Sequence, residues 1–122
     1  MKTKTKNIVY WVLAGVVSLL FIASAFGKIT ENPDAIGMAK AFGIEPSTFR
    51  ILGVVELVSA LLFLYPRTGV LGTLLLAAYM GGALATHIEH GLSPLAPAIV
   101  SAFVWVVGIV RFPELKQRLF NN

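Results

Sequence analysis

This chain of 122 residues has few charges and no cysteine. Only 13% of its residues are charged and 57% are hydrophobic, a balance far from that of a typical soluble domain. The lack of cysteine excludes a disulfide exchanger, a thiol relay and any cysteine-ligated metal site. A chain so poor in charge is expected to lie in a lipid bilayer, which is then its main partner.

Long hydrophobic runs indicate how many helices cross that bilayer. About 18 apolar residues without charge mark a transmembrane helix, and such runs lie within residues 8–26, 68–88 and 92–112. A fourth segment, 46–65, is long enough if Arg50 extends to the lipid headgroups. We therefore predict an all-α fold in which residues 1–122 form one integral membrane domain, a bundle of four transmembrane helices.

The N-terminus has a second interpretation. Lys2, Lys4 and Lys6 precede an apolar run that ends in the small-residue stretch 23–26, which resembles a secretory signal with its cleavage site. That run is longer than the hydrophobic region of most signals, and a four-helix bundle needs it as one wall. We favour a retained helix.

The distribution of Lys and Arg predicts the orientation, because cytoplasmic loops carry the excess of these residues. Seven fall on one side of the expected spans and three on the other. The first group is Lys2, Lys4, Lys6, Arg67, Arg111, Lys116 and Arg118, and the second is Lys28, Lys40 and Arg50. Both termini are therefore expected in the cytoplasm, with the chain in the cytoplasmic membrane. The amphipathic tail 113–120 can lie on that leaflet, and no folded basic surface remains for nucleic acid.

Only the outer loop 27–45 is long enough for structure of its own. Asn32 or Asp34 can cap a short helix there, and Gly43 is typical of a helix stop. We expect a short interfacial helix that lies on the membrane surface or covers the end of the bundle.

Glu56 is the one acid inside an apolar run, and it is expected near mid-membrane. It shares a helix face with Gly53 and Ser59, small residues that let another helix approach. Counting about 1.5 Å of rise per residue brings four further side chains near this depth, namely Ser18, Tyr79, Ser101 and Trp105. We expect Glu56 to face the interior of the bundle.

No Lys or Arg is expected at the depth of Glu56, because Lys28 and Arg50 fall at the outer boundary and Arg67 at the inner one. A lone carboxylate in a low dielectric favours its neutral form, so Glu56 is expected to be largely protonated. It could then donate to Tyr79 or to a quinone carbonyl, or it could simply join helices by hydrogen bonds, and both roles stay open. The candidate ligand-binding set is Glu56, Tyr79, His87, Trp105, Ser18 and Ser101.

His87, Glu89 and His90 could suggest a metal or haem site. Structural zinc needs four ligands, and the chain has only these two histidines, so neither a full zinc set nor a second axial histidine is in reach. We expect His87 to bond helix carbonyls or the outer loop, and His90 to be solvated. No metal site, catalytic residue or firm cofactor is predicted, although a quinone or another apolar ligand could bind.

The middle of the chain resembles a known family. The segment from Gly53 to Gly91 contains a Gly-x-x-Glu-Leu start, a Pro-Arg-Thr turn and the stretch Met80 to His87, and "SAFGKIT" comes earlier, at residues 24–30. These motifs are similar to those of the DoxX-like family of small four-helix membrane proteins. The matching family positions are Glu56, Pro66, Arg67, Thr68 and His87.

The resemblance implies a function without defining its chemistry. Members are linked to quinone-dependent sulfur oxidation, terminal oxidases and oxidative-stress complexes, and distant relatives look like cargo receptors and assembly chaperones. It favours an accessory membrane subunit of a redox system, with a ligand pocket around Glu56 and no catalysis by this chain alone. The alternative is a non-enzymatic scaffold or assembly chaperone that recruits another membrane protein, and a homo-oligomer is also open.

Overall fold

A computed structural model describes residues 2–121 of the chain and contains no β-strand within them. The ordered elements, in chain order, are α1 (Thr3–Ile29), α2 (Pro33–Ala41), α3 (Pro46–Leu64), the short 3₁₀ helix η1 (Pro66–Thr68), α4 (Gly69–Glu89), α5 (Leu95–Arg111) and α6 (Pro113–Phe120). The prediction of an all-α fold is confirmed.

The helix boundaries differ from those expected mainly in α1. The expected helix 8–26 extends at both ends, to Thr3 and to Ile29, so that Lys28 belongs to its last turn. Proline marks two of the other breaks. Tyr65 and Phe112 precede Pro66 and Pro113 and both have extended backbones, because a residue before proline is disfavoured in the helical conformation.

Three helical segments are long and apolar enough to cross a membrane, namely α1, α3 and η1 together with α4. The pair α5 and α6 counts as a fourth span if the two are taken as one bent segment, with 108° between them. Large apolar side chains such as Leu19 and Ile99 are 69% and 61% exposed. Lipid is the environment in which such a surface is stable.

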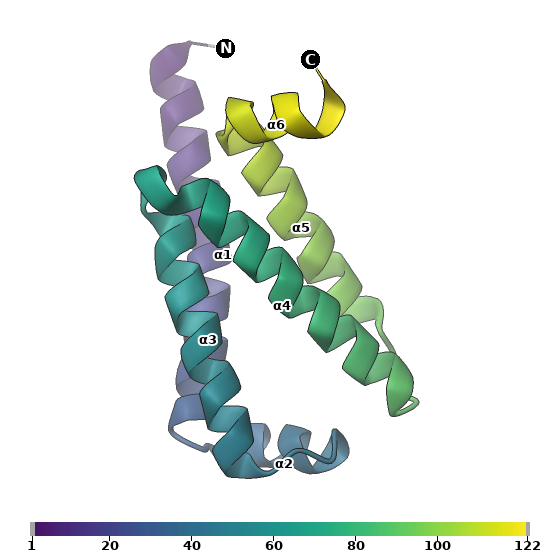
Figure 1. Cartoon of the computed structure of the whole chain (residues 1–122). Helices are drawn as coiled ribbons and strands as arrows, with labels where there is room; N and C mark the ends of the chain where they lie inside the picture. Colours follow the sequence, from purple (N-terminus) through teal and green to yellow (C-terminus); the bar gives the residue numbers. More distant parts are fainter. Residues whose placement is uncertain (1, 122) are drawn as a thin grey trace.

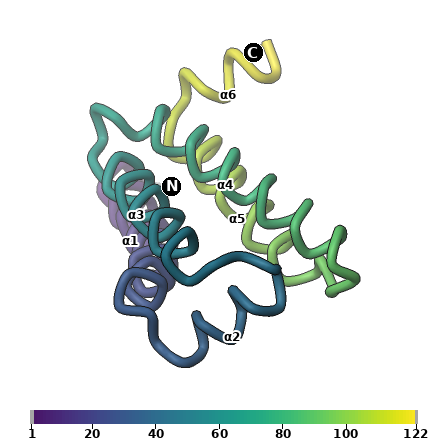
Figure 2. The backbone as a smooth tube through the Cα atoms, turned by 60° about the horizontal axis from the view of Figure 1, so that its bottom comes forward, coloured from purple at the N-terminus to yellow at the C-terminus, as the bar shows by residue number. Residues whose placement is uncertain are grey.

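The long helices form two pairs that diverge. α1 packs along α3, α3 contacts α4, and α4 packs along α5. Figure 1 shows the pair α1–α3 and the pair α4–α5 close together near α6 and wide apart at the opposite end, where α2 lies. Figure 2 shows α2 from that end, in front of the space between the pairs. The two termini lie at the same end of the protein, away from α2.

Glycines allow the close contact at the narrow end. A Cβ on Gly72 would lie 2.1 Å from the backbone nitrogen of Phe63, and one on Gly108 would lie 2.5 Å from a methyl group of Thr73. Phe63 and Thr73 are fully buried. The backbones of α3 and α4 therefore approach as closely as small residues permit in membrane helix pairs, and Gly108 of α5 leaves room for the side chain of Thr73 of α4.

Arg111 joins three elements at the same end. Its guanidinium donates to the carbonyl oxygens of Phe63 and Leu64, at 2.6 and 2.7 Å, and it lies 5.2 Å from the ring centre of Trp11. The last carbonyls of a helix have no partner within that helix. Arg111 of α5 therefore supplies the missing donors at the end of α3 and holds α1 beside them.

The segment between α1 and α3 contains the expected short helix. Asn32, one of the two candidate caps, accepts a hydrogen bond at 2.8 Å from the backbone of Ala35. Gly43 has a φ of +67°, and the next residue, Ile44, donates 2.8 Å back to the carbonyl of Ala39, which is a Schellman stop. The buried side of α2 packs in a separate apolar cluster formed by Ala35, Ala39, Phe42 and Phe49.

Candidate functional site

A cavity of about 490 Å³ lies where the two helix pairs diverge. Most of its wall is apolar, and this part consists of Leu20, Phe21, Met38, Phe42, Ile44, Phe49, Leu52, Ala78, Met80, Gly82, Ala83, Ala96, Pro97 and Val100. The polar part consists of Ser24, Lys28, Glu56, Tyr79, Thr86 and His87. The cavity is thus a largely hydrophobic space with polar groups from α1, α3 and α4.

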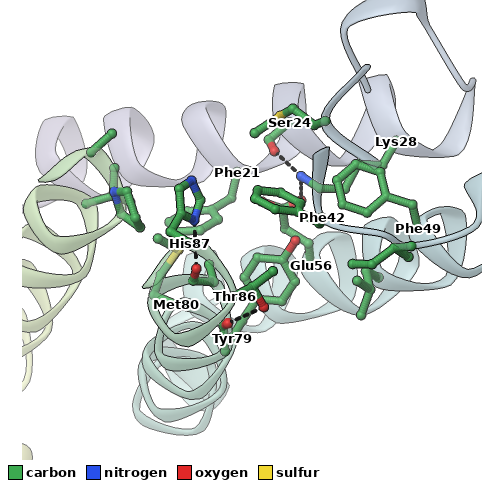
Figure 3. A pocket seen from close by; sticks show the side chains of 18 of the residues that line it. Phe21, Ser24, Lys28, Phe42, Phe49, Glu56, Tyr79, Met80, Thr86 and His87 are labelled. Atoms are coloured by element: carbon green, nitrogen blue, oxygen red, sulfur yellow. Dashed lines mark hydrogen bonds and ion pairs between the residues drawn. The ribbon is translucent and has the colours of Figure 1, made fainter. Parts of the chain in front are cut away.

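The centre of the polar part is an ion pair between α1 and α3. The ammonium nitrogen of Lys28 lies 3.0 Å from Oε1 of Glu56, whose residue is only 2% exposed. The same ammonium donates to the hydroxyl of Ser24 at 2.5 Å. Figure 3 shows Lys28 between Ser24 and Glu56, with Phe49 and Tyr79 close by, and their ring centres lie 5.3 and 6.0 Å from its nitrogen.

The expectation that Glu56 has no basic partner is therefore wrong. It assumed that the first helix ends near Phe26, which would leave Lys28 in a loop at the membrane boundary. Because α1 continues to Ile29, and helical side chains point toward the N-terminus of their helix, Lys28 extends back by one turn into the bundle. This contact removes the reason for expecting a neutral Glu56.

One sequence signal could have identified Lys28. It lies four residues after Ser24 and seven after Phe21, so all three fall on one face if the helix continues. The apolar run alone did not indicate that continuation, because the lysine itself ends the run. Lys28 is the main site residue that sequence reasoning missed.

Two further predicted site residues, Tyr79 and His87, do line the cavity. Nδ1 of His87 lies 2.7 Å from the carbonyl oxygen of Ala83, and because a carbonyl only accepts, this nitrogen must carry the proton. The ring meets Phe42 edge-on with 4.9 Å between ring centres. His87 therefore connects α4 to the segment that follows α2, and both residues of this contact line the cavity.

Ser18, Ser101 and Trp105 do not line the cavity. Ser18 is buried, and its hydroxyl has no hydrogen-bond partner among residues 2–121, while Ser101 and Trp105 are half-buried. Counting the rise per residue placed them near Glu56, on the assumption that the helix axes stay side by side along their whole length. The pairs instead diverge, so the open space lies toward α2 and not at the level where these three side chains lie.

The second histidine does not join the site. His90 is exposed, and its Nδ1 bonds the carbonyl of Thr86 at 2.9 Å. Within the described residues, no group of three or more His, Cys, Asp or Glu side chains is placed to hold a metal ion. The polar groups Lys28, Glu56, Ser24 and Tyr79 supply hydrogen bonds and charge in the cavity.

Comparison with known proteins identifies the family of this chain. The model of the DoxX-like family matches residues 12–109. The chain belongs to the DoxX-like family. Every residue that lines the cavity, from Leu20 to Val100, falls within the matched range of this DoxX-like protein. No curated protein and no solved structure matches the chain.

The family and the helices agree on where this DoxX-like protein resides. Three to four helical segments are long and apolar enough to span a bilayer, and their outer surfaces carry large apolar side chains. The DoxX-like protein is an integral membrane protein in contact with lipid.

Proposed function

We propose that this DoxX-like protein is an accessory membrane subunit of a redox system, and that its cavity holds a quinone or a similar neutral, apolar molecule beside the Lys28–Glu56 pair. In this proposal α1, α3, α4 and α5 cross the cytoplasmic membrane as a four-helix bundle and α2 lies at the outer interface. Both termini are cytoplasmic, as the excess of Lys and Arg at their end favours. A partner protein carries out the electron transfer.

The observation that carries the proposal is the position of an ion pair in the wall of a mostly apolar cavity. Ligand sites combine apolar walls with a few polar groups that fix orientation, and ionisable residues inside a membrane mark functional sites more often than chance. The ammonium of Lys28 can donate to a carbonyl oxygen of a ligand, and the hydroxyl of Tyr79 can donate or accept. The rings of Phe42 and Phe49 can cover the ligand's apolar body.

The charge of the site favours a neutral ligand. Lys28 and Glu56 compensate one another, so a ligand with a net charge would enter a low dielectric without a counterion, which is costly. A quinone carries carbonyl acceptors and no net charge. The volume of about 490 Å³ lies within the range of about 300–1,000 Å³ that is usual for small-molecule sites.

Native mass spectrometry of the protein gently extracted from its own membrane tests this function. A retained mass of quinone size is expected in the unmodified protein and is expected to be lost in Glu56→Gln and reduced in Tyr79→Phe. Glu89→Gln is the matched control, because it makes the same change at an exposed position outside the cavity. Retention that is equal in all four proteins, or absent from all of them, would contradict the proposal.

The second candidate function is a scaffold or assembly chaperone, and the face of α4 around Gly81 favours it. A Cβ on Gly81 would meet nothing within 4 Å, so this face is free to receive another helix, as small residues allow in membranes. Gly82 and Ala83 line the cavity, so only Gly81 tests the scaffold separately. In the same mass spectrometry experiment, the unmodified protein would retain a stoichiometric partner protein and the Gly81→Leu variant would lose it. If neither of the two proteins retains a small molecule, this result would favour the scaffold.

A further inference from the structure

The C-terminal helix α6 lies crosswise to the helix before it. α5 and α6 meet at an angle of 108°, because Phe112 is extended and Pro113 cannot continue the hydrogen-bond ladder of α5. Leu115 packs against the rest of the protein and is only 6% exposed. Where α5 crosses the bilayer by itself, a helix held nearly perpendicular to it runs along the bilayer surface.

The rest of α6 combines exposed apolar and basic side chains. Leu119 and Phe120 are 46% and 56% exposed, and Lys116 and Arg118 are exposed beside them. The only acid in the helix is Glu114, in its first turn. Basic amphipathic helices of this composition bind at membrane interfaces, where apolar side chains enter the acyl boundary and basic ones meet the headgroups.

The same end of the protein carries further positive charge. The N-terminus of α1 lies there and carries the exposed Lys2, Lys4 and Lys6. η1, which joins α3 to α4 at the same end, carries the exposed Arg67. Of the six acids in the chain, only Glu114 lies near this end. Asp34 lies in α2, and Glu31, Glu45 and Glu89 lie at or next to the ends of α1, α3 and α4 that are near α2. Glu56 lines the cavity. This end of the molecule is therefore complementary to an anionic surface.

We propose that α6 docks on the anionic phospholipid headgroups of the leaflet at this end of the protein, with Leu119 and Phe120 inserted at the acyl boundary and Lys116 and Arg118 on the phosphates. Each basic residue near an anionic membrane surface strengthens lipid binding by about fivefold. The contact tethers the last helix to the membrane without any partner protein. It is independent of the ligand proposed for the cavity.

Single cysteines can locate α6 relative to the bilayer, because the chain has none of its own. Leu119→Cys and Gln117→Cys are each labelled with a nitroxide in the full chain, in nanodiscs of phosphatidylglycerol and phosphatidylcholine. The label at 119 is expected to be accessible to oxygen and shielded from a water-soluble nickel chelate. The label at 117 is expected to be accessible to the nickel chelate and less accessible to oxygen. If nickel reaches both labels equally, α6 is in water and the proposal is wrong.

The lipid class is tested by native mass spectrometry of protein released from the same nanodiscs. The double variant Lys116→Gln/Arg118→Gln is expected to lose retained phosphatidylglycerol by about fivefold for each charge removed, and 1 M salt is expected to have a similar effect on the unmodified protein. Lys40→Gln, an exposed lysine of α2 at the other end, is the matched control. Equal losses in both variants, or no enrichment of phosphatidylglycerol over phosphatidylcholine, would overturn the proposal.

Discussion

Lys28 of α1 and Glu56 of α3 form a buried ion pair at 3.0 Å in the wall of the cavity. The two residues are 28 positions apart in the chain, and they join two antiparallel helices at the end where the bundle opens. Gly53 lets the helices come this close, because a Cβ there would lie 2.8 Å from Cβ of Lys28. The pair therefore contributes both to the packing of α1 on α3 and to the polarity of the cavity.

Replacing one partner of this ion pair is expected to destabilise the protein more than replacing both. Lys28→Met or Glu56→Leu alone leaves an uncompensated buried charge, at a cost of about 3–5 kcal/mol. The double variant leaves none and is expected to recover much of that loss. Thermal unfolding in detergent of the two single variants and the double variant measures the coupling, and strictly additive losses would contradict it.

The contact between Gly72 and Phe63 predicts a steep effect of a single methyl group. Gly72→Ala places a Cβ about 2 Å from the backbone of Phe63, and overpacking of this kind costs about 1–3 kcal/mol or more. Gly81→Ala is the matched control on the same helix, with open space around it. The melting temperature is expected to fall in the first variant and to hold or rise in the second. Equal melting temperatures would show that α3 and α4 are not in close contact.

The two hydrogen bonds of Arg111 at the narrow end lead us to expect that this position requires a guanidinium group. Lysine cannot donate to both carbonyls of Phe63 and Leu64 in the fork geometry that arginine has. Arg111→Lys is therefore expected to lose about 1.5–3 kcal/mol of unfolding free energy, the range for a hydrogen bond to a charged group. Arg67→Lys, an exposed arginine of η1, is expected to change it little. Chemical denaturation of both variants in micelles measures their free energies of unfolding. Equal values for the two variants would contradict the prediction.

Because Phe42 packs on His87, we expect that removing the Phe42 ring will loosen the attachment of α2 to α4. Ala39 is fully buried in the apolar cluster with Phe42, so Ala39→Cys is expected to react slowly with a maleimide. Adding Phe42→Ala removes the ring that packs on His87 and is expected to speed the reaction several-fold. Met38→Cys, at an exposed position of the same helix, reports the intrinsic rate. An unchanged rate at 39 would mean that Phe42 does not hold α2 in place.

The amino-acid sequence alone predicts the all-α membrane class, because runs of about 18 uncharged apolar residues are stable mainly as helices in lipid. It also determined the breaks at Pro66 and Pro113, and the start and stop of α2, because local backbone chemistry suffices for proline turns, an asparagine cap and a glycine stop. These features depend only on neighbouring residues.

Which residues meet at the cavity depends on how the helices pack, and this became clear only from the three-dimensional structure. Glu56 and Tyr79 were singled out by their chemistry and depth, and His87 by its chemistry. The partner Lys28 was missed because a charge at the end of an apolar run was interpreted as the end of the helix. Ser18, Ser101 and Trp105 have suitable depth, yet the divergence of the two helix pairs leaves the open space nearer α2. Gly72 lets the backbones of α3 and α4 touch at the narrow end, and such a contact is a property of two facing helices and not of any single one.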